Sequence, residues 1–159
     1  MQFKIEQIAL FTNKSADAIQ LLTAIGLTDW VHDHVVANGY VHGVFGQNEA
    51  DLDFNYQATG EKNLELEILN YTKGNHWMSA VPGVPTVSHL GMHVTPTELL
   101  SWKKLLGEMG YAIAQTVMTE SHTNSHIANS RRYNYVIFDT RKVIGVDLKF
   151  IVRYVADPE

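Results

Sequence analysis

Apolar and polar positions alternate along several stretches of the chain, most clearly from 87 to 94. Such alternation is typical of a β-strand with one buried face. The opposite face of this strand carries two imidazoles, His89 and His93. Because the face away from the core either meets solvent or lines a pocket, ligand-type side chains there indicate a candidate site.

The same patterns before residue 73 predict a strand, a helix and three more strands. The helix has apolar residues at helical spacing and ends before Gly26, which suits the left-handed position after a helix. The expected elements are a strand over 5–12, a helix over 15–25, a strand or loose hairpin arm over 30–45, and strands over 51–58 and 64–71. This order is β-α-β-β-β.

After a connector over 73–85, which glycines and prolines interrupt, the same order recurs. Thr95 and Glu98 have the spacing of a capping box, and Pro96 occupies the first helical turn. The expected elements are a strand over 87–94, a helix over 96–109, and strands over 111–119, 132–139 and 143–154. A polar loop over 120–131, which holds His122 and His126, separates two of these strands.

The spacing of polar residues supports a duplication. From Gln7 to Glu67, and again from His89 to Lys149, the chain advances by 60 positions (67 − 7 and 149 − 89). A duplicated β-α-β-β-β unit explains this coincidence. Each unit alone would leave one sheet face unburied, so the two units should pair, with their other faces around a shared cleft. We therefore predict an α+β fold.

The predicted boundaries follow from the duplication. Residues 1–159 form a single domain, in which 1–72 is the first βαβββ module and 86–156 is the second. A chain of 159 residues is long enough to bury a substantial core in this way.

Composition excludes several classes of function. The net charge of −5 provides no basic footprint for nucleic acid or for an anionic membrane. The chain has no cysteine, which rules out disulfides, thiolate metal sites and cysteine nucleophiles. No apolar run has the length of a membrane span or the character of a signal peptide. We therefore expect a cytoplasmic protein.

Three short motifs, in consistent order and spacing, resemble the vicinal oxygen chelate superfamily. They are Gln-Ile-Ala-Leu at 7–10, Leu-Glu-Ile-Leu at 66–69 and His-Leu-Gly-Met at 89–92. This superfamily includes glyoxalase I, methylmalonyl-CoA epimerase, extradiol dioxygenases, and fosfomycin-modifying and bleomycin-binding proteins. The resemblance covers nearly the whole chain. It implies a glyoxalase-like fold, a small-molecule ligand in the cleft and a homodimer.

The resemblance also implies a divalent metal ion, such as zinc, nickel, iron or manganese. The family holds it with one residue from each of the first, fourth, fifth and eighth strands. In this chain those positions are Gln7, Glu67, His89 and Lys149. Glyoxalase I of the eukaryotic kind is similar at the first three, and its fourth ligand is a carboxylate that also moves the proton. A lysine ammonium only donates hydrogen bonds, so it cannot ligate a cation and would repel one.

Three interpretations of this departure stay open. In the first, a metal binds the three retained ligands, and Asp147 or His93 completes its shell. In the second, no metal binds, and Lys149, paired with Glu67, supplies the positive charge for a substrate carboxylate or oxyanion. In the third, the register differs by two positions and Asp147 is the true ligand. The Lys149–Glu67 pair is also compatible with a purely structural role.

Two functions follow from the resemblance. The first is lyase or isomerase chemistry of the glyoxalase or epimerase kind, in which Glu67 or His89 removes a proton beside a carbonyl and a cation such as Lys149 stabilises the enolate. The alternative is a metal-free protein of the bleomycin-resistance type that sequesters its ligand. An extradiol dioxygenase is disfavoured, because its iron site requires two histidines and a carboxylate from the first, fifth and eighth strands, and Gln7 and Lys149 do not match that set. A basic loop over 120–131 would suit an anionic ligand.

Overall fold

The computed structural model describes residues 1–60, 62–74, 85–119 and 131–155. The predicted connector over 73–85 and the predicted histidine loop over 120–131 lie almost wholly outside the described residues. The elements are, in order, β1 (Gln7–Phe11), α1 (Ser15–Ala24), β2 (Val31–Val41), β3 (Val44–Thr59), β4 (Lys62–Lys73), β5 (Thr86–His93), α2 (Pro96–Glu108), β6 (Ile113–Thr119), β7 (Arg131–Phe138), α3 (Arg141–Ile144) and β8 (Asp147–Val155). This confirms the α+β fold with two βαβββ repeats.

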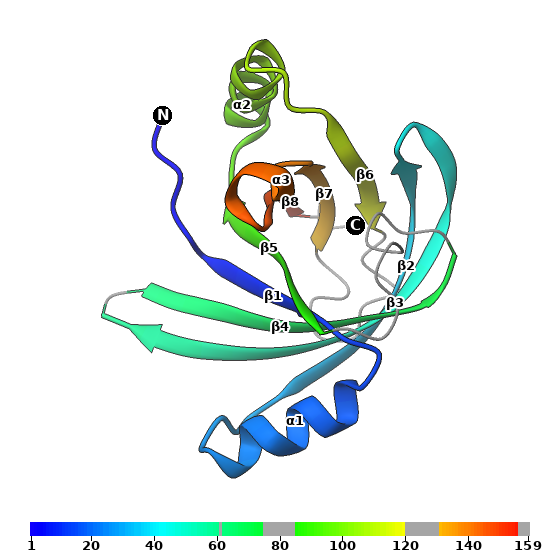
Figure 1. Ribbon diagram of the computed structural model, residues 1–159. Coiled ribbons are helices and arrows are strands. Elements are labelled where there is room, and N and C mark those ends of the chain that lie inside the picture. Colours follow the sequence, from blue (N-terminus) through cyan, green and yellow to red (C-terminus); the bar gives the residue numbers. More distant parts are fainter. Residues whose placement is uncertain (61, 75–84, 120–130, 156–159) are drawn as a thin grey trace.

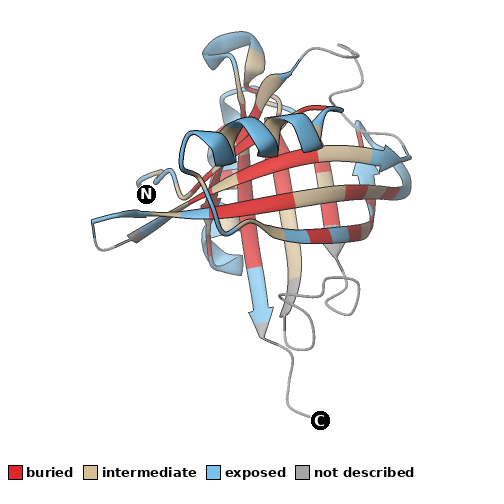
Figure 2. Ribbon diagram, turned by 90° about the horizontal axis from the view of Figure 1, so that it is seen from below, coloured by how far each residue is buried: buried red, intermediate tan, exposed pale blue. Residues whose placement is uncertain are grey.

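The eight strands close into a barrel in the order β1-β4-β3-β2-β6-β7-β8-β5. The first and last strands of each repeat are parallel neighbours, β1 with β4 and β5 with β8. The repeats join through the antiparallel pairs β1–β5 and β2–β6. Figure 1 shows α1 and α2 on opposite outer sides of the barrel. Figure 2 shows that the buried parts of the strands lie toward their middles, whereas helix α1 is largely exposed.

The hairpin between β2 and β3 falls inside the stretch predicted as a strand or hairpin arm over 30–45. Strand β2 ends at Val41 and β3 begins at Val44. The two residues between them, His42 and Gly43, both have positive φ, 46° and 80°. Two such residues match the twist of a tight hairpin turn. The flanking residues are β-branched or aromatic on both sides, so the apolar pattern alone does not mark the turn.

The strand predicted over 143–154 is wrong at its beginning. Residues 141–144 form the short helix α3, which ends at Gly145 in the left-handed conformation with φ of 80°. The carboxylate of Asp147 accepts hydrogen bonds from the backbone N–H groups of Thr140 and Arg141, at 3.3 and 3.2 Å. These bonds hold the turn, and β8 begins only at Asp147.

The capping box predicted before the second long helix is present. Thr95 Oγ1 accepts from the backbone N–H of Glu98 at 3.2 Å, and the Glu98 carboxylate accepts from the backbone N–H of Thr95 at 2.7 Å. This pair satisfies two donors at the start of α2. The pKa of Glu98 is lowered, chiefly because its carboxylate accepts these bonds from Thr95.

Within the described residues, no helix combines the length and the apolar character needed to cross a bilayer.

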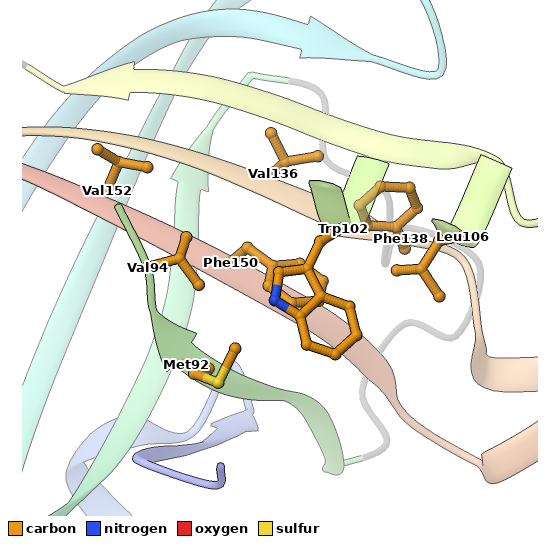
Figure 3. Packing of buried hydrophobic residues seen from close by; sticks show 8 residues of the cluster. All are labelled: Met92, Val94, Trp102, Leu106, Val136, Phe138, Phe150 and Val152. Carbon is orange, nitrogen blue, oxygen red and sulfur yellow. The ribbon is translucent and has the colours of Figure 1, made fainter. Parts of the chain in front are cut away.

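Helix α2 covers the outer face of β5 and β8 and forms the main core with it. Trp102 stacks on Phe150 with ring centroids 5.2 Å apart, and Phe138 meets Phe150 edge-on at 5.8 Å. Met92 and Val94 belong to the apolar face predicted for the strand over 87–94, and they pack in the same hydrophobic cluster (Figure 3). Because side chains alternate along a strand, the other faces of β5 and β8 point into the barrel.

Candidate active site in the barrel cavity

The barrel encloses a cavity with about 810 Å³ of empty space, including its opening to solvent. The lining of this cavity combines polar and apolar side chains. The polar and aromatic lining includes Gln7, Asn48, Glu65, Glu67, Tyr71, His89, Tyr133, Tyr135, Lys149 and Arg153. The apolar lining includes Val35, Ala37, Ala50, Leu52, Phe54, Leu69, Ile137 and Ile151. A cavity of this kind suits a small molecule with a polar end and an apolar body.

The structure brings together the four positions singled out by the 60-residue spacing. All four side chains are buried and line the cavity. They come from four different strands that are neighbours in the barrel: Gln7 on β1, Glu67 on β4, His89 on β5 and Lys149 on β8.

Two small residues lie at the centre of this arrangement. Ala9 pairs in register with Glu67 on one side and with His89 on the other. Gly91, at the equivalent position of the second repeat, pairs with the other two of the four residues. A β-carbon on Gly91 would lie 2.9 Å from Oε1 of Gln7. The absence of a side chain there leaves room for the Gln7 amide.

The Gln7 amide connects the polar groups. Its Oε1 accepts from His89 Nε2 at 2.9 Å and from Lys149 Nζ at 3.1 Å, and its Nε2 donates to the carboxylate of Glu65. This orientation follows from the neighbours, since an ammonium can only donate and a carboxylate can only accept. His89 therefore carries its proton on Nε2, and its Nδ1 accepts from the hydroxyl of Ser88 at 3.0 Å.

Glu67 has the properties of a general base. Its Oε2 lies 3.7 Å from Lys149 Nζ and 3.8 Å from His89 Nε2, and this buried oxygen has no hydrogen-bond partner among the described residues. Burial raises the pKa of this carboxyl, while the Lys149 charge acts against the rise. Glu67 lines the cavity, and a buried carboxylate with a raised pKa and an oxygen without a hydrogen-bond partner among the described residues is suited to accept a proton.

His89 is held neutral. Burial is the main cause that lowers its pKa well below 6.5, and the positive charges of Lys149 and Arg141 act in the same direction. Its Nε2 proton is directed at Gln7, and Ser88 occupies Nδ1. Of the two bases considered from the sequence, Glu67 is the one whose geometry leaves an oxygen available.

The lowered pKa of His89 predicts a pH dependence of stability. Below pH 6.5 the unfolded chain takes up a proton on this imidazole, whereas the folded protein does not. The free energy of unfolding therefore decreases as the pH is lowered, by up to about 1.4 kcal/mol per pH unit. His89→Gln should remove this contribution in urea unfolding at pH 7.5, 6.5 and 5.5. His42→Asn, in an exposed turn with φ of 46°, should keep the wild-type dependence. If the free energy of unfolding of His89→Gln depends on pH as that of the wild type does, His89 does not have a lowered pKa in the folded protein.

The donor set does not fit a divalent metal ion. Lys149 Nζ lies among the residues that correspond to the family's ligands, 3.1 Å from Gln7 Oε1 and 3.7 Å from Glu67 Oε2, and 4.7 Å from the Tyr135 ring centroid. An ammonium at this point already supplies the positive charge and offers no lone pair. Among the residues that the structure describes, no group of three or more His, Asp or Glu side chains has the arrangement of a metal site.

The two residues considered as replacement ligands both have other partners. The buried carboxylate of Asp147 pairs with the Arg141 guanidinium at 3.2 Å, which also donates to the carbonyl oxygen of Val87 at 3.0 Å. His93 Nδ1 lies 3.0 Å from the carboxylate of Glu6. Neither Asp147 nor His93 lines the cavity. Asp147 pairs in register with His89 on the adjacent strand, but its carboxylate is held by Arg141, and its role as a ligand stays a prediction.

Sequence reasoning missed the outer part of the polar wall, formed by Tyr133, Tyr135 and Arg153. The face of the two tyrosines could not be assigned from their strand alone. Arg153, however, lies four positions after Lys149 on β8, so the alternation of strand side chains places both on the same face. That signal was available in the sequence.

Comparisons with known proteins give matches in structure alone. No family model matches this sequence, and no curated protein matches it either. A variant of Streptomyces coelicolor methylmalonyl-CoA epimerase, in complex with 2-nitronate-propionyl-CoA, is similar at 10% identity and a TM-score of 0.58 over 96% of this chain and 98% of that one. A second variant of this epimerase has 11% identity and a TM-score of 0.59, over 99% and 100% of the two chains.

A variant of 4-hydroxymandelate synthase from Streptomyces coelicolor is also similar, at 13% identity and a TM-score of 0.56. This chain is covered over 98% of its length and spans 50% of that protein. The chain therefore has the fold of the vicinal oxygen chelate superfamily, as its motifs predicted. Since identities this low establish the fold alone, the chemistry must be argued from the cavity.

Proposed function

We propose that this protein is an enzyme of the lyase or isomerase kind, which moves a proton at the carbon beside a carbonyl of a small molecule. Glu67 is the base, and the Lys149 ammonium takes the role that a metal ion has in relatives with this fold. One observation carries the proposal. A buried ammonium lies 3.7 Å from a buried carboxylate oxygen that has no hydrogen-bond partner among the described residues, and both line one cavity.

The proposed chemistry is a proton transfer to Glu67, followed by delivery of the proton to a different carbon or by elimination. The carbonyl oxygen of the substrate accepts a hydrogen bond from Lys149 Nζ. Glu67 removes the proton from the neighbouring carbon and becomes neutral, and the electron pair moves onto the carbonyl oxygen. The ammonium stabilises the enolate charge, which a cation in a dry site does more effectively than in water. Delivery of the proton by Glu67 to the neighbouring carbon of an enediolate gives the isomer, and loss of a neighbouring leaving group gives the lyase product.

Gln7 and His89 position the cation in this proposal. Lys149 donates to the oxygen of the Gln7 amide, and that oxygen also accepts from His89. The neutral imidazole adds no further positive charge beside Lys149. The flexible lysine side chain is therefore held toward Glu67, and less of its conformational freedom is left to lose when a substrate binds.

The Lys149 charge also argues against a resident metal ion in this site. A divalent ion about 4 Å from a fixed ammonium would be opposed by about 8 kcal/mol at an effective dielectric constant of about 20. A metal on Gln7, Glu67 and His89 would also have to displace the hydrogen bonds that Gln7 accepts. We therefore assign no metal to the proposed reaction.

The structural neighbours are compatible with this reaction class. Several are methylmalonyl-CoA epimerases, and one of these is described in complex with methylmalonyl-CoA and ammonium. An epimerase inverts a carbon centre, which is an isomerase reaction. The low identity means that this supports the proposal through the shared fold only.

Deuterium exchange tests the proposal. The protein is incubated in D₂O with 2-oxo acids that carry aliphatic or aromatic side chains, and the proton signal at carbon 3 is followed by NMR. We expect protein-dependent loss of this signal for at least one compound, with no change on adding EDTA. Exchange that EDTA abolishes would contradict the metal-free site. Binding of these acids without exchange would favour the alternative, a ligand-sequestering protein of the bleomycin-resistance type.

We further propose that the chain acts as a cytoplasmic homodimer with no nucleic-acid or membrane partner. The net charge of −5 supports the absence of a polyanionic partner. The division into one domain, 1–159, with modules 1–72 and 86–156, also stays a proposal.

A further inference from the structure

A second cation lines the cavity outside the proposed reacting centre. On the wall formed by β7 and β8, Tyr133 pairs in register with Arg153, and the guanidinium carbon lies 5.5 Å from the centroid of the Tyr133 ring. In the same way, Lys149 Nζ lies 4.7 Å from the centroid of the Tyr135 ring. The wall thus carries two cation–aromatic pairs, and all four residues line the cavity.

Within the part of the chain that the structure describes, the Arg153 guanidinium makes no side-chain hydrogen bond. Oε2 of Glu65, the carboxylate oxygen with which it pairs, is 3.8 Å away, which is too far for a hydrogen bond. Glu65 already accepts a hydrogen bond from the Gln7 amide. A guanidinium has five donors arranged to bind a carboxylate through two parallel bonds. About a third of the Arg153 side chain, 35%, is exposed, so this group lies toward the opening of the cavity.

The positions of the two cations limit the length of a ligand that meets both. Lys149 lies beside Glu67, and Arg153 lies beside Glu65. These two glutamates are two residues apart on one face of β4, a separation of about 6–7 Å. The charged ends of Lys149 and Arg153 should have a similar separation, although their backbone positions, four residues apart on β8, are about 13 Å apart.

The opposite wall favours an apolar body. Val35 from β2 and Leu52 and Phe54 from β3 line the cavity there, with Asn48 as a polar neighbour on β3. A compound with two polar ends alone would leave this surface without a partner. Burial of an aromatic or branched aliphatic group against it adds free energy in proportion to the apolar area covered.

We propose that Arg153, stacked on Tyr133, is a carboxylate-binding subsite, and that the substrate is a carbonyl compound with an apolar body and a carboxylate about 6–7 Å from the carbonyl oxygen. The inference rests on the proposed function, because it takes the end bound by Lys149 to be the reacting end. Arg153 is a specificity-determining residue in this arrangement, since it selects the carboxylate and takes no part in the proton transfer.

Calorimetric titration with three stable compounds tests this subsite. In 3-phenylglutarate, one carboxylate stands in for the enolate oxygen at Lys149 and the other meets Arg153. The matched compound 3-phenylbutanoate has a hydrogen atom in place of the second carboxylate, and glutarate lacks the phenyl group. We expect the wild-type protein to bind 3-phenylglutarate about tenfold or more tightly than either compound, the gain typical of a charge-assisted bidentate contact or a buried aromatic ring.

Arg153→Gln should lower the affinity for 3-phenylglutarate about tenfold and leave that for 3-phenylbutanoate unchanged. Arg153→Lys, which keeps the charge but loses the planar fork, should fall between wild type and Arg153→Gln. The control Lys104→Gln removes an exposed charge that pairs with Glu108 on α2 and should bind like the wild type. If Arg153→Gln does not fold, the comparison of the two phenyl compounds on wild-type protein decides the question.

Equal affinities for 3-phenylglutarate and 3-phenylbutanoate would overturn the subsite, as would an equal loss for both in Arg153→Gln or no binding of either compound at millimolar concentration. The deuterium-exchange assay, repeated with 5-oxo-3-phenylhexanoate, the methyl-ketone analogue of 3-phenylglutarate, separates this outcome from failure of the proposed function. Exchange of this compound with no Arg153-dependent discrimination refutes the subsite alone. Arg153-dependent binding with no exchange of this compound supports the subsite and refutes the proton-transfer reaction.

Discussion

Replacement of Glu67 by glutamine should lower the rate of deuterium exchange beside the substrate carbonyl by about 10²- to 10⁴-fold. Glutamine has nearly the same shape and can still accept a hydrogen bond, but it cannot take up the proton. The Glu67 oxygen nearest Lys149 has no hydrogen-bond partner among the described residues, so it is the available acceptor in the polar wall. NMR exchange rates of wild type and variant, at equal concentrations of folded protein, give the measurement.

Glu65→Gln is the matched control for Glu67→Gln. Glu65 lies two residues away on the same face of β4, but its carboxylate already accepts from Gln7 and lies beside Arg153. Its replacement should therefore change substrate binding more than the exchange rate at saturation. Equal losses of the saturated rate in both variants would contradict the assignment of the base. The wild-type rate should also rise with pH above 4.5, because burial raises the pKa of Glu67 and only its ionised form accepts a proton.

The fold and the four central positions were predictable because both depend on long-range regularity. Each repeat places its first and last strands side by side, and the strand alternation fixes which side chains face inward. The 60-residue offset therefore matched Gln7 with Glu67 and His89 with Lys149. The identity of Lys149 also raised the possibility that a cation replaces the metal. These inferences needed no knowledge of side-chain conformation.

The rest of the site depends on local geometry that the patterns do not carry. The position of Asp147 is an example. Register arguments allowed it to be a ligand, but a helical turn at 141–144 brings the Arg141 guanidinium and two backbone donors to its carboxylate. Turn formation there is governed by Gly145 and by hydrogen bonds within seven residues. The apolar pattern of the strand that follows contains no information about it.

The role of Gln7 was likewise beyond the sequence. An amide can present its oxygen or its nitrogen to a neighbour, and only the arrangement of Lys149 and Glu65 around it decides which. This choice makes Gln7 the acceptor that holds the ammonium. It also fixes the protonated nitrogen of His89, which removes this ring as a base.

Lys149→Glu should convert the cavity into a divalent metal site, with a gain in zinc affinity of about 10³-fold or more over the wild type. The change removes the repelling ammonium and adds a carboxylate next to Gln7, Glu67 and His89, which are buried and face the same cavity. It should also abolish exchange in metal-free buffer, because the enolate loses its cation. Zinc titration by calorimetry, with metal content measured after dialysis, gives the affinity and the stoichiometry of one ion per chain.

Two further variants separate charge removal from ligand addition. Lys149→Met removes the ammonium and adds no donor, so it should gain much less zinc affinity than Lys149→Glu. The double variant Lys149→Glu/His89→Ala lacks one of the expected ligands and should lose most of the gain. If Lys149→Glu binds zinc no better than Lys149→Met, the four positions are not equivalent to a ligand set. If the wild type already binds one ion per chain with the affinity of Lys149→Glu, Lys149 is not the cation of this site.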